Sequence, residues 1–140
     1  MSEDTPRLVV DSSIAVKWFL SENESHVSDA WELLEAHLIG LTVLCTPPHL
    51  RLEVLNTMCS RRFPEAEILK AADALEGFRL EWHSVDGALA RSAAELAARH
   101  NLTLYDAAFA ALALTLDAEL VTADRRVASC GACRARLLGG

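Results

Sequence analysis

The sequence predicts an α/β sandwich built around a mainly parallel β-sheet. Short apolar runs rich in β-branched residues alternate along the chain with longer segments of helical periodicity. This alternation is typical of parallel strands joined by helices that cover the faces of a sheet. At 140 residues the chain is also long enough to bury the core of such a domain. We therefore expect one domain, spanning residues 1–140.

Five apolar segments are expected to supply the strands of this sheet. The first is the β-branched run RLVV, and the second is bounded by Pro47 and Pro48. The third has a weaker strand pattern, and the last is short. The expected strands are residues 7–10, 41–45, 79–85, 119–122 and 135–138.

Six segments carry helical signals. Ser12 or Ser13 can cap the first helix, and Gly40 ends the second. Pro48 suits the first turn of the third helix, and Pro64 both ends that helix and opens the fourth. The last helix is apolar almost all round, which indicates burial. The expected helices are residues 13–20, 26–39, 49–62, 65–76, 86–100 and 103–116.

Charge and hydropathy restrict the classes of function. A net charge of −7 argues against nucleic-acid binding by a broad basic surface, but it is compatible with a nuclease that holds cations in an acidic cluster. The start of the chain, MSEDTPR, has no signal-peptide pattern. The longest apolar region, 102–121, is interrupted by Asp106, Asp117 and Glu119, so no membrane span is expected. We expect a cytoplasmic protein.

Cysteines and histidines give weaker signals. Cys45 and Cys59 lie in apolar patterns and are interpreted as small core residues. Cys130 and Cys133 form CGAC, which has the spacing of a redox pair or half a zinc site, but no second such pair follows. We favour a surface loop with two incidental thiols. The histidines are scattered without ligand spacing and are interpreted as surface or packing residues: His26, His37, His49, His83 and His100.

Two aspartates follow short apolar strands. Asp11 ends the sequence LVVD, and Asp124 ends LVTAD. In an open parallel sheet, ligands bind outside the carboxyl ends of the strands. If these two strands are neighbours, the two carboxylates approach each other there. A buried carboxylate is costly unless its charge is compensated, so Asp11 in particular needs a partner.

Two further acids lie in predicted helices, and each also has a structural explanation. Thr103 and Asp106 have the spacing of a capping box at the start of a helix. Glu53 interrupts an apolar helical face, and glutamate is rarely buried without a partner. A nearby arginine would be a sufficient partner. The arginines nearest to it in sequence are Arg51, Arg61 and Arg62.

Taken together, the four acids indicate a cation site. Like charges close together raise each other's pKa, and a divalent cation removes that penalty. Magnesium and manganese prefer oxygen ligands, and such a site can turn water into a nucleophile for phosphodiester hydrolysis. The expected ion is Mg²⁺ or Mn²⁺. The candidate ligands and catalytic residues are Asp11, Glu53, Asp106 and Asp124.

Four motifs in order carry a resemblance to a known family. VVDSSIAVKWFL, PPHLRLEVLN, LTLYDAAFAALAL and ELVTADRR resemble the PIN-domain ribonucleases, and above all the VapC toxins of type II toxin–antitoxin pairs. The similarity extends from the first strand to Arg126. It implies a three-layer α/β/α fold with a five-stranded parallel sheet. It also implies RNA cleavage dependent on Mg²⁺ or Mn²⁺, a homodimer, and inhibition by a small antitoxin protein.

The resemblance further implies a role for individual residues. The four acids would hold the metal, with Asp11 and Asp106 touching it directly if only two do. Metal-held water would attack the phosphorus, with no protein nucleophile. Ser13 and Thr122 match hydroxyl positions that support the site.

Some features fit this family less well, and two alternatives remain open. CGAC is not part of the family pattern, and the RNA-contacting surface is unidentified; the nearest basic candidates are Lys17, Arg125 and Arg126. One alternative is a catalytically inactive PIN-like domain that binds RNA or a partner protein. The other is a phospho-acceptor receiver domain, which needs a late lysine, whereas no lysine follows Lys70.

Overall fold

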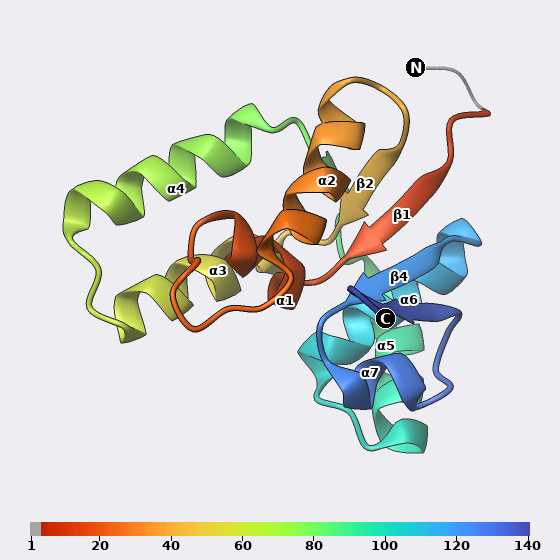
Figure 1. Ribbon diagram of the computed structural model, residues 1–140. Helices are drawn as coiled ribbons and strands as arrows, with labels where there is room; N and C mark the ends of the chain where they lie inside the picture. The colour runs from red at the N-terminus through yellow and green to blue at the C-terminus, as the bar shows by residue number, and fades with distance from the viewer. Residues whose placement is uncertain (1–3) are drawn as a thin grey trace.

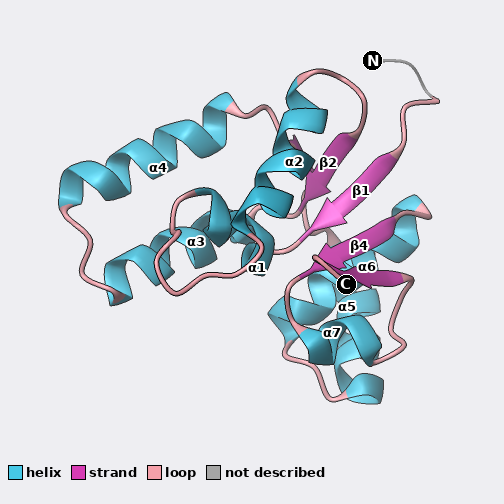
Figure 2. Ribbon diagram, in the orientation of Figure 1, coloured by secondary structure: helices cyan, strands magenta, loops and turns pink. Residues whose placement is uncertain are grey.

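A parallel β-sheet lies at the centre of the protein (Figures 1 and 2). The computed structural model describes residues 4–140. Within these residues, five strands pair in the order β3-β2-β1-β4-β5, and every pairing is parallel. The strands are β1 (Arg7–Val10), β2 (Val43–Thr46), β3 (Glu81–Trp82), β4 (Glu119–Thr122) and β5 (Ala135–Leu137).

Helices cover both faces of the sheet. In Figure 1, α1 to α4 lie on one side of it, and α5, α6 and α7 lie on the other. The three-layer α/β/α fold with a five-stranded parallel sheet is therefore confirmed. The helices are α1 (Ser12–Ala15), the 3₁₀ helix η1 (Val16–Trp18), α2 (Val27–Leu38), α3 (His49–Ser60), α4 (Glu65–Gly77), α5 (Gly87–His100), α6 (Leu104–Leu116) and α7 (Arg125–Ser129).

Helix α6 is the most deeply buried helix and packs against β1 and β4. Residues 107–113 are all buried, as the all-round apolar pattern predicted. Phe109, at 1% exposure, is the largest of these side chains. Because α6 lies under the two central strands, its N-terminus is held near their carboxyl ends.

The strand order explains why acids distant in sequence meet. β1 pairs with β2 on one side and with β4 on the other, with Val10 opposite Val121. The residues that follow β1 and β4 therefore emerge together at one edge of the sheet. Asp11 and Asp124 lie at this edge.

Several predicted boundaries were wrong. The helix expected at 13–20 is one turn of α1 followed by η1, and its cap is Asp11 rather than a serine. The strand expected at 79–85 is limited to Glu81–Trp82. Helix α7 was not predicted, because five residues are too short for a periodic signal.

Some individual residues also differ from expectation. Cys59 is exposed, so its interpretation as a core residue is wrong, whereas Cys45 is buried as expected. Lys17 is buried, and its ammonium group donates to Glu24 Oε1 at 3.0 Å and to the Ser25 carbonyl at 2.7 Å. It therefore holds the 21–25 loop against η1. Among the described residues, no helix is both long and apolar enough to cross a membrane.

Candidate active site

Asp11 is the most buried of the candidate acids, with 5% of its surface exposed. One carboxylate oxygen accepts a hydrogen bond from the Oγ1 atom of Thr122, the last residue of β4, at 2.6 Å. The other accepts from the Ser13 backbone N–H at 3.1 Å and from the Ser13 hydroxyl. Asp11 is thus the N-cap of α1 and is fixed from two elements at once.

Ser13 and Thr122 extend this network to the fourth acid. The Ala123 N–H donates to Ser13 Oγ at 2.8 Å, and the Asp124 N–H donates to Thr122 Oγ1 at 3.1 Å. The turn after β4 is therefore tied to the same hydroxyls that orient Asp11. This is the position in which supporting residues were expected.

Electrostatics at Asp11 are dominated by burial. Burial raises the pKa of the Asp11 carboxyl from 3.8 to about 6, although hydrogen bonds from Ser13 and Thr122 oppose the shift. The nearby Asp106 carboxylate raises the pKa of Asp11 further through like-charge repulsion. The ionised form of Asp11 is therefore poorly compensated by the protein's own groups.

The Glu53 side chain extends from α3 toward Ser12 and the Asp106 carboxylate. Its Oε1 atom accepts from Ser12 Oγ at 3.2 Å and lies 3.8 Å from His49 Nε2. Burial and the Asp106 carboxylate raise the pKa of Glu53, and the Ser12 hydrogen bond lowers it. Its described contacts are with a hydroxyl and an imidazole, rather than with the arginine partner that was the alternative.

Two of the three arginines close to Glu53 in sequence have other partners. Arg51 pairs with Glu76 at 2.6 Å and stacks over the Trp82 ring at 3.7 Å. Arg61 lies 3.6 Å from Glu24. Neither of these two arginines pairs with the Glu53 carboxylate.

Asp106 lies in the first turn of α6. Its backbone N–H donates to Thr103 Oγ1 at 3.1 Å, so the helix-cap interpretation holds for the backbone. Its carboxylate accepts from the Arg126 guanidinium at 3.2 Å. The same group of Arg126 lies 4.0 Å from the Asp124 carboxylate. Arg126 thus bridges the third and fourth acids.

Asp124 has a second role as the N-cap of α7. Its Oδ1 atom accepts from the Arg126 N–H at 2.9 Å and from the Val127 N–H at 3.4 Å. Asp106 interacts through its charge with both Asp11 and Glu53, whereas Asp124 is connected to the site through Arg126 and the Thr122 hydroxyl.

Two contributors were missed in the sequence. Ser12 was considered only as a helix cap, and His49 only as a surface or packing residue. His49 Nε2 lies 3.1 Å from the Tyr105 carbonyl, and burial lowers the pKa of this imidazole. The spacing of His49 and Glu53, four residues apart on one helix, was the signal that could have paired them.

A groove of about 520 Å³ opens beside Glu53. Its lining is mostly apolar and comes from α3 and the start of α6. Leu52 and Tyr105 at this groove are 72% and 62% exposed. The lining residues are His49, Leu52, Glu53, Leu55, Asn56, Cys59 and Tyr105.

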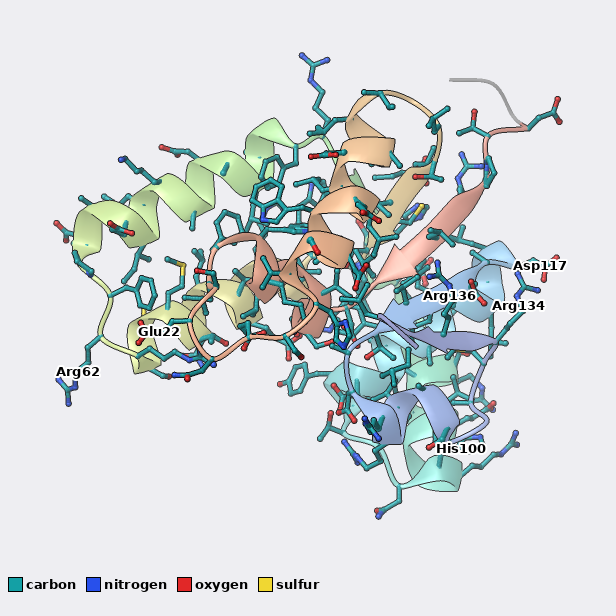
Figure 3. The ribbon with its side chains drawn as sticks, viewed as in Figure 1. Glu22, Arg62, His100, Asp117, Arg134 and Arg136 are labelled. Carbon is teal, nitrogen blue, oxygen red and sulfur yellow. The ribbon has the colours of Figure 1, made fainter. Side chains whose placement is uncertain are left out.

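Basic side chains differ in their distance from the acids. Arg134 and Arg136, labelled in Figure 3, pair with Asp117 at 3.9 Å and Glu119 at 3.1 Å. Glu119 begins β4, so these pairs lie at the edge of the sheet opposite Asp11. Lys17 is committed to Glu24. Of the basic candidates predicted from sequence, Arg126 contacts the acids directly.

The fold and this acidic edge define the chain as an α/β protein with a candidate cation site at the carboxyl ends of its strands. The family model of the PIN domain matches residues 8–131. The chain therefore belongs to the PIN domain family, as its motifs indicated. A search of curated proteins finds no match for this chain.

Solved structures share the fold at low sequence identity. VapC20 of Mycobacterium tuberculosis, described as a toxin that cleaves the sarcin-ricin loop, is 19% identical with a TM-score of 0.71, covering 89% of this chain and 95% of that one. VapBC2 of Rickettsia felis, bound to a promoter DNA fragment, is 15% identical with a TM-score of 0.72, covering 94% and 98%. DNA-bound VapBC of Salmonella typhimurium is 17% identical with a TM-score of 0.66, covering 95% and 98%.

Proposed function

We propose that this chain is a metal-dependent endoribonuclease that hydrolyses RNA phosphodiester bonds and acts as the toxin of a toxin–antitoxin pair. The observation that carries the proposal is the convergence of Asp11, Glu53 and Asp106 at the carboxyl edge of the sheet. Asp106 raises the pKa of both other acids, so its carboxylate repels each of them in the protein alone. A cation is the natural compensation.

The donor set fits a hard divalent cation. The candidate ligands are carboxylate oxygens, which Mg²⁺ and Mn²⁺ prefer. Asp11 and Asp106 would hold the ion most directly, with Glu53 and Asp124 completing the acidic site. Bound there, Mg²⁺ or Mn²⁺ would supply an activated water and stabilise charge on the departing oxygen.

The protein's own residues position this site. Thr122 and Ser13 donate hydrogen bonds to Asp11 and so hold its carboxylate at the carboxyl end of β1. Ser12 orients Glu53 in the same way. Arg126 neutralises part of the charge of Asp106 and is the basic group next to the acids, so we assign it to phosphate contact when RNA binds.

We also propose a small antitoxin as partner and a homodimer as the assembly. The structural relatives include VapBC complexes, which supports an antitoxin partner. The exposed apolar groove beside Glu53 supports a protein surface that becomes covered in an assembly. The cytoplasmic location expected from the sequence remains part of this proposal.

Cleavage of RNA by the purified protein tests the proposal. Mixed RNA is incubated with Mg²⁺ or Mn²⁺ and the wild-type protein, Asp11→Asn, or Asp117→Asn as a matched control. Asp117 is fully exposed at the far end of α6, and asparagine suits its left-handed backbone conformation. We expect cleavage by the wild type and the control, and none by Asp11→Asn or in EDTA.

Two outcomes would contradict the proposal. Cleavage that persists in Asp11→Asn or in EDTA refutes the metal mechanism. An absence of cleavage by folded wild type on all RNAs supports the alternative, an inactive PIN-like domain that binds RNA or a protein. The toxin role is tested separately, by whether expression of the chain arrests growth and whether co-expression of a small protein encoded beside it relieves that arrest.

A further inference from the structure

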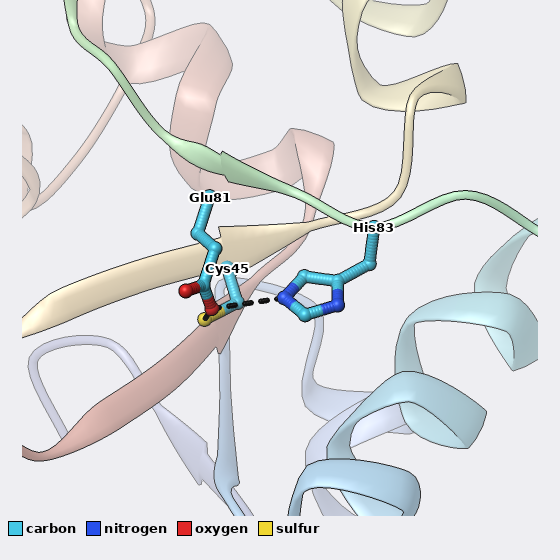
Figure 4. Close-up of side chains that lie close together, drawn as sticks. All are labelled: Cys45, Glu81 and His83. Carbon is cyan, nitrogen blue, oxygen red and sulfur yellow. Dashed lines mark hydrogen bonds and ion pairs between the residues drawn. The ribbon is translucent and has the colours of Figure 1, made fainter. Parts of the chain in front are cut away.

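Three side chains with metal-binding atoms meet at the β2–β3 edge of the sheet. The Cys45 sulfur, a Glu81 carboxylate oxygen and a His83 ring nitrogen lie within 4.8 Å of one another (Figure 4). None of these residues belongs to the acidic site at the ends of β1 and β4. The cluster combines a sulfur, an oxygen and a nitrogen ligand, which is a different donor set from four carboxylates.

Sheet geometry fixes the three residues relative to one another. Cys45 and Glu81 are paired partners on the parallel strands β2 and β3, so their side chains leave the same face. His83 follows Glu81 by two residues and returns to that face. Its backbone N–H donates to the Thr46 carbonyl at 3.0 Å, which continues the ladder between the strands. Cys45 and Glu81 thus lie on paired strands, and His83 directly follows β3 and is still hydrogen-bonded to β2.

The intervening residue, Trp82, faces the other way. Arg51 of α3 stacks over its ring at 3.7 Å. Alternation along the strand therefore directs Trp82 toward the α3 layer and leaves Glu81 and His83 on the opposite face. Trp82 therefore packs this segment against α3. That packing does not explain why Glu81 and His83 meet Cys45 on the other face.

The hydrogen bonds of the cluster converge on one atom. Glu81 Oε2 lies 2.9 Å from Cys45 Sγ, 2.9 Å from His83 Nε2 and 2.9 Å from Arg7 Nε. These three donors lower the pKa of the Glu81 carboxyl, and Arg7 has the largest effect. If His83 carries its proton on the other nitrogen, its lone pair instead faces the carboxylate oxygen and repels it. In that second tautomer the His83 nitrogen, the Cys45 sulfur and the Glu81 oxygen are three ligand atoms within 4.8 Å of one another.

We propose that Cys45, Glu81 and His83 bind a zinc ion. A mixed set of thiolate, imidazole and carboxylate suits Zn²⁺, which binds such ligands at about 2.0–2.3 Å, and it suits Mg²⁺ poorly. A Cys45 thiolate and the Glu81 carboxylate would balance the two charges of the ion, and the Arg7 guanidinium would be one further positive charge beside Glu81. Arg7 retains its second hydrogen bond, from its Nη2 atom to Glu81 Oε1 at 3.2 Å.

The surroundings of the cluster agree with this site. Glu81 and His83 have 32% and 28% of their side chains exposed, which gives an ion a path from solvent and leaves room for water as a fourth ligand. Cys45 is buried, and burial together with the Glu81 carboxylate raises the pKa of its thiol. Zinc binding would therefore have to release the proton of this thiol.

The consequence for the fold lies at β3. This edge strand has two residues, and it is joined to β2 through the pairs Cys45–Glu81 and Thr46–Trp82. A zinc ion bridging Cys45 to Glu81 and His83 cross-links the two strands through side chains. The ion would therefore brace the sheet edge, and this effect on stability is independent of the proposed RNA cleavage.

Metal titration of the full chain tests this inference. The protein is stripped with EDTA, exchanged into EDTA-free buffer, and titrated with Zn²⁺ against a chromophoric chelator and separately with Co²⁺ by absorption spectroscopy. We expect one tight Zn²⁺ equivalent, a thiolate-to-cobalt charge-transfer band, and a higher Tm with Zn²⁺. His83→Gln should weaken Zn²⁺ binding at least ~10-fold, and Cys45→Ser should remove the band.

Matched variants distinguish this site from the CGAC segment and from the acidic site, which could also bind a metal. The double variant Cys130→Ser/Cys133→Ser and the variant Asp106→Asn should keep both the band and the affinity. His83 is partly exposed, so His83→Gln remains informative if Cys45→Ser does not fold, and circular dichroism without metal verifies its fold. A cobalt spectrum without a thiolate band, or a band abolished by Cys130→Ser/Cys133→Ser, would overturn the proposal.

Discussion

Replacing Asp11 by asparagine should stabilise the metal-free protein at neutral pH. Burial and Asp106 raise the pKa of the Asp11 carboxyl from 3.8 to about 6. A carboxyl whose pKa is higher in the folded state lowers stability as pH rises from about 4 to about 6, and that loss persists above pH 6. Asparagine cannot ionise and escapes this penalty.

The magnitude follows from the size of the pKa shift. A difference of about 2 units corresponds to ~3 kcal/mol at pH 7, at 1.36 kcal/mol per unit. The asparagine amide disturbs the hydrogen bond from Thr122, a loss of about 1 kcal/mol. Asp11→Asn should therefore be about 2 kcal/mol more stable than wild type at pH 7. At pH 4, where most of the penalty is absent, it should be equal or slightly less stable.

Urea unfolding of both proteins in EDTA, at pH values from 4 to 8, measures this crossover. Glu53 also has a raised pKa, but it is present in both proteins and largely cancels in the comparison. Saturating Mg²⁺ should reverse the order at pH 7, because the ion stabilises the wild-type carboxylate. The reasoning is refuted if Asp11→Asn is less stable at pH 7 in EDTA, or if the difference does not vary with pH.

Three further changes test other parts of the structure. Thr122→Val leaves a buried oxygen of Asp11 without its hydrogen-bond donor. Urea unfolding at pH 7 should show a loss of stability of about 1–3 kcal/mol, and an unchanged midpoint would contradict the assigned contact. Arg126→Ala removes a cation from Asp106 and should strengthen Mg²⁺ binding a few-fold in calorimetric titration; weaker binding would show that Arg126 supports the metal site instead. Lys17→Met removes the ion pair with Glu24, which then keeps, among the contacts of the described residues, the longer one to Arg61. The free energy of unfolding should fall by about 2 kcal/mol, whereas an unchanged unfolding midpoint would show that the buried pair is neutral.

The acidic site was predictable because each acid breaks a local pattern. Asp11 and Asp124 end apolar strands, Glu53 interrupts an apolar helical face, and Asp106 begins a buried helix. These signals are local, and the rule that ligands bind at the carboxyl edge of a parallel sheet brings them together. The structure adds that Asp124 is connected through Arg126, which no local pattern indicated.

The cluster of Cys45, Glu81 and His83 was not predictable in the same way. Cys45 fits an apolar strand, and His83 has no second histidine at ligand spacing. Their approach depends on the register of β2 against β3, in which Cys45 faces Glu81 across 36 residues of chain. Register between parallel strands is set by the packing of both sheet faces, so a single segment does not contain it.

The fold class, the apolar helix α6 and the identity of the acids can be read from the sequence, because they follow from periodicity and from charges placed in apolar patterns. The groups that compensate each charge are known from the folded structure alone. Asp11, which directly follows β1, is held by Thr122, a residue 111 positions away. Lys17, six residues after Asp11, is held by Glu24. Partners of this kind are chosen by three-dimensional proximity in a low-dielectric interior, where an unpaired charge is costly.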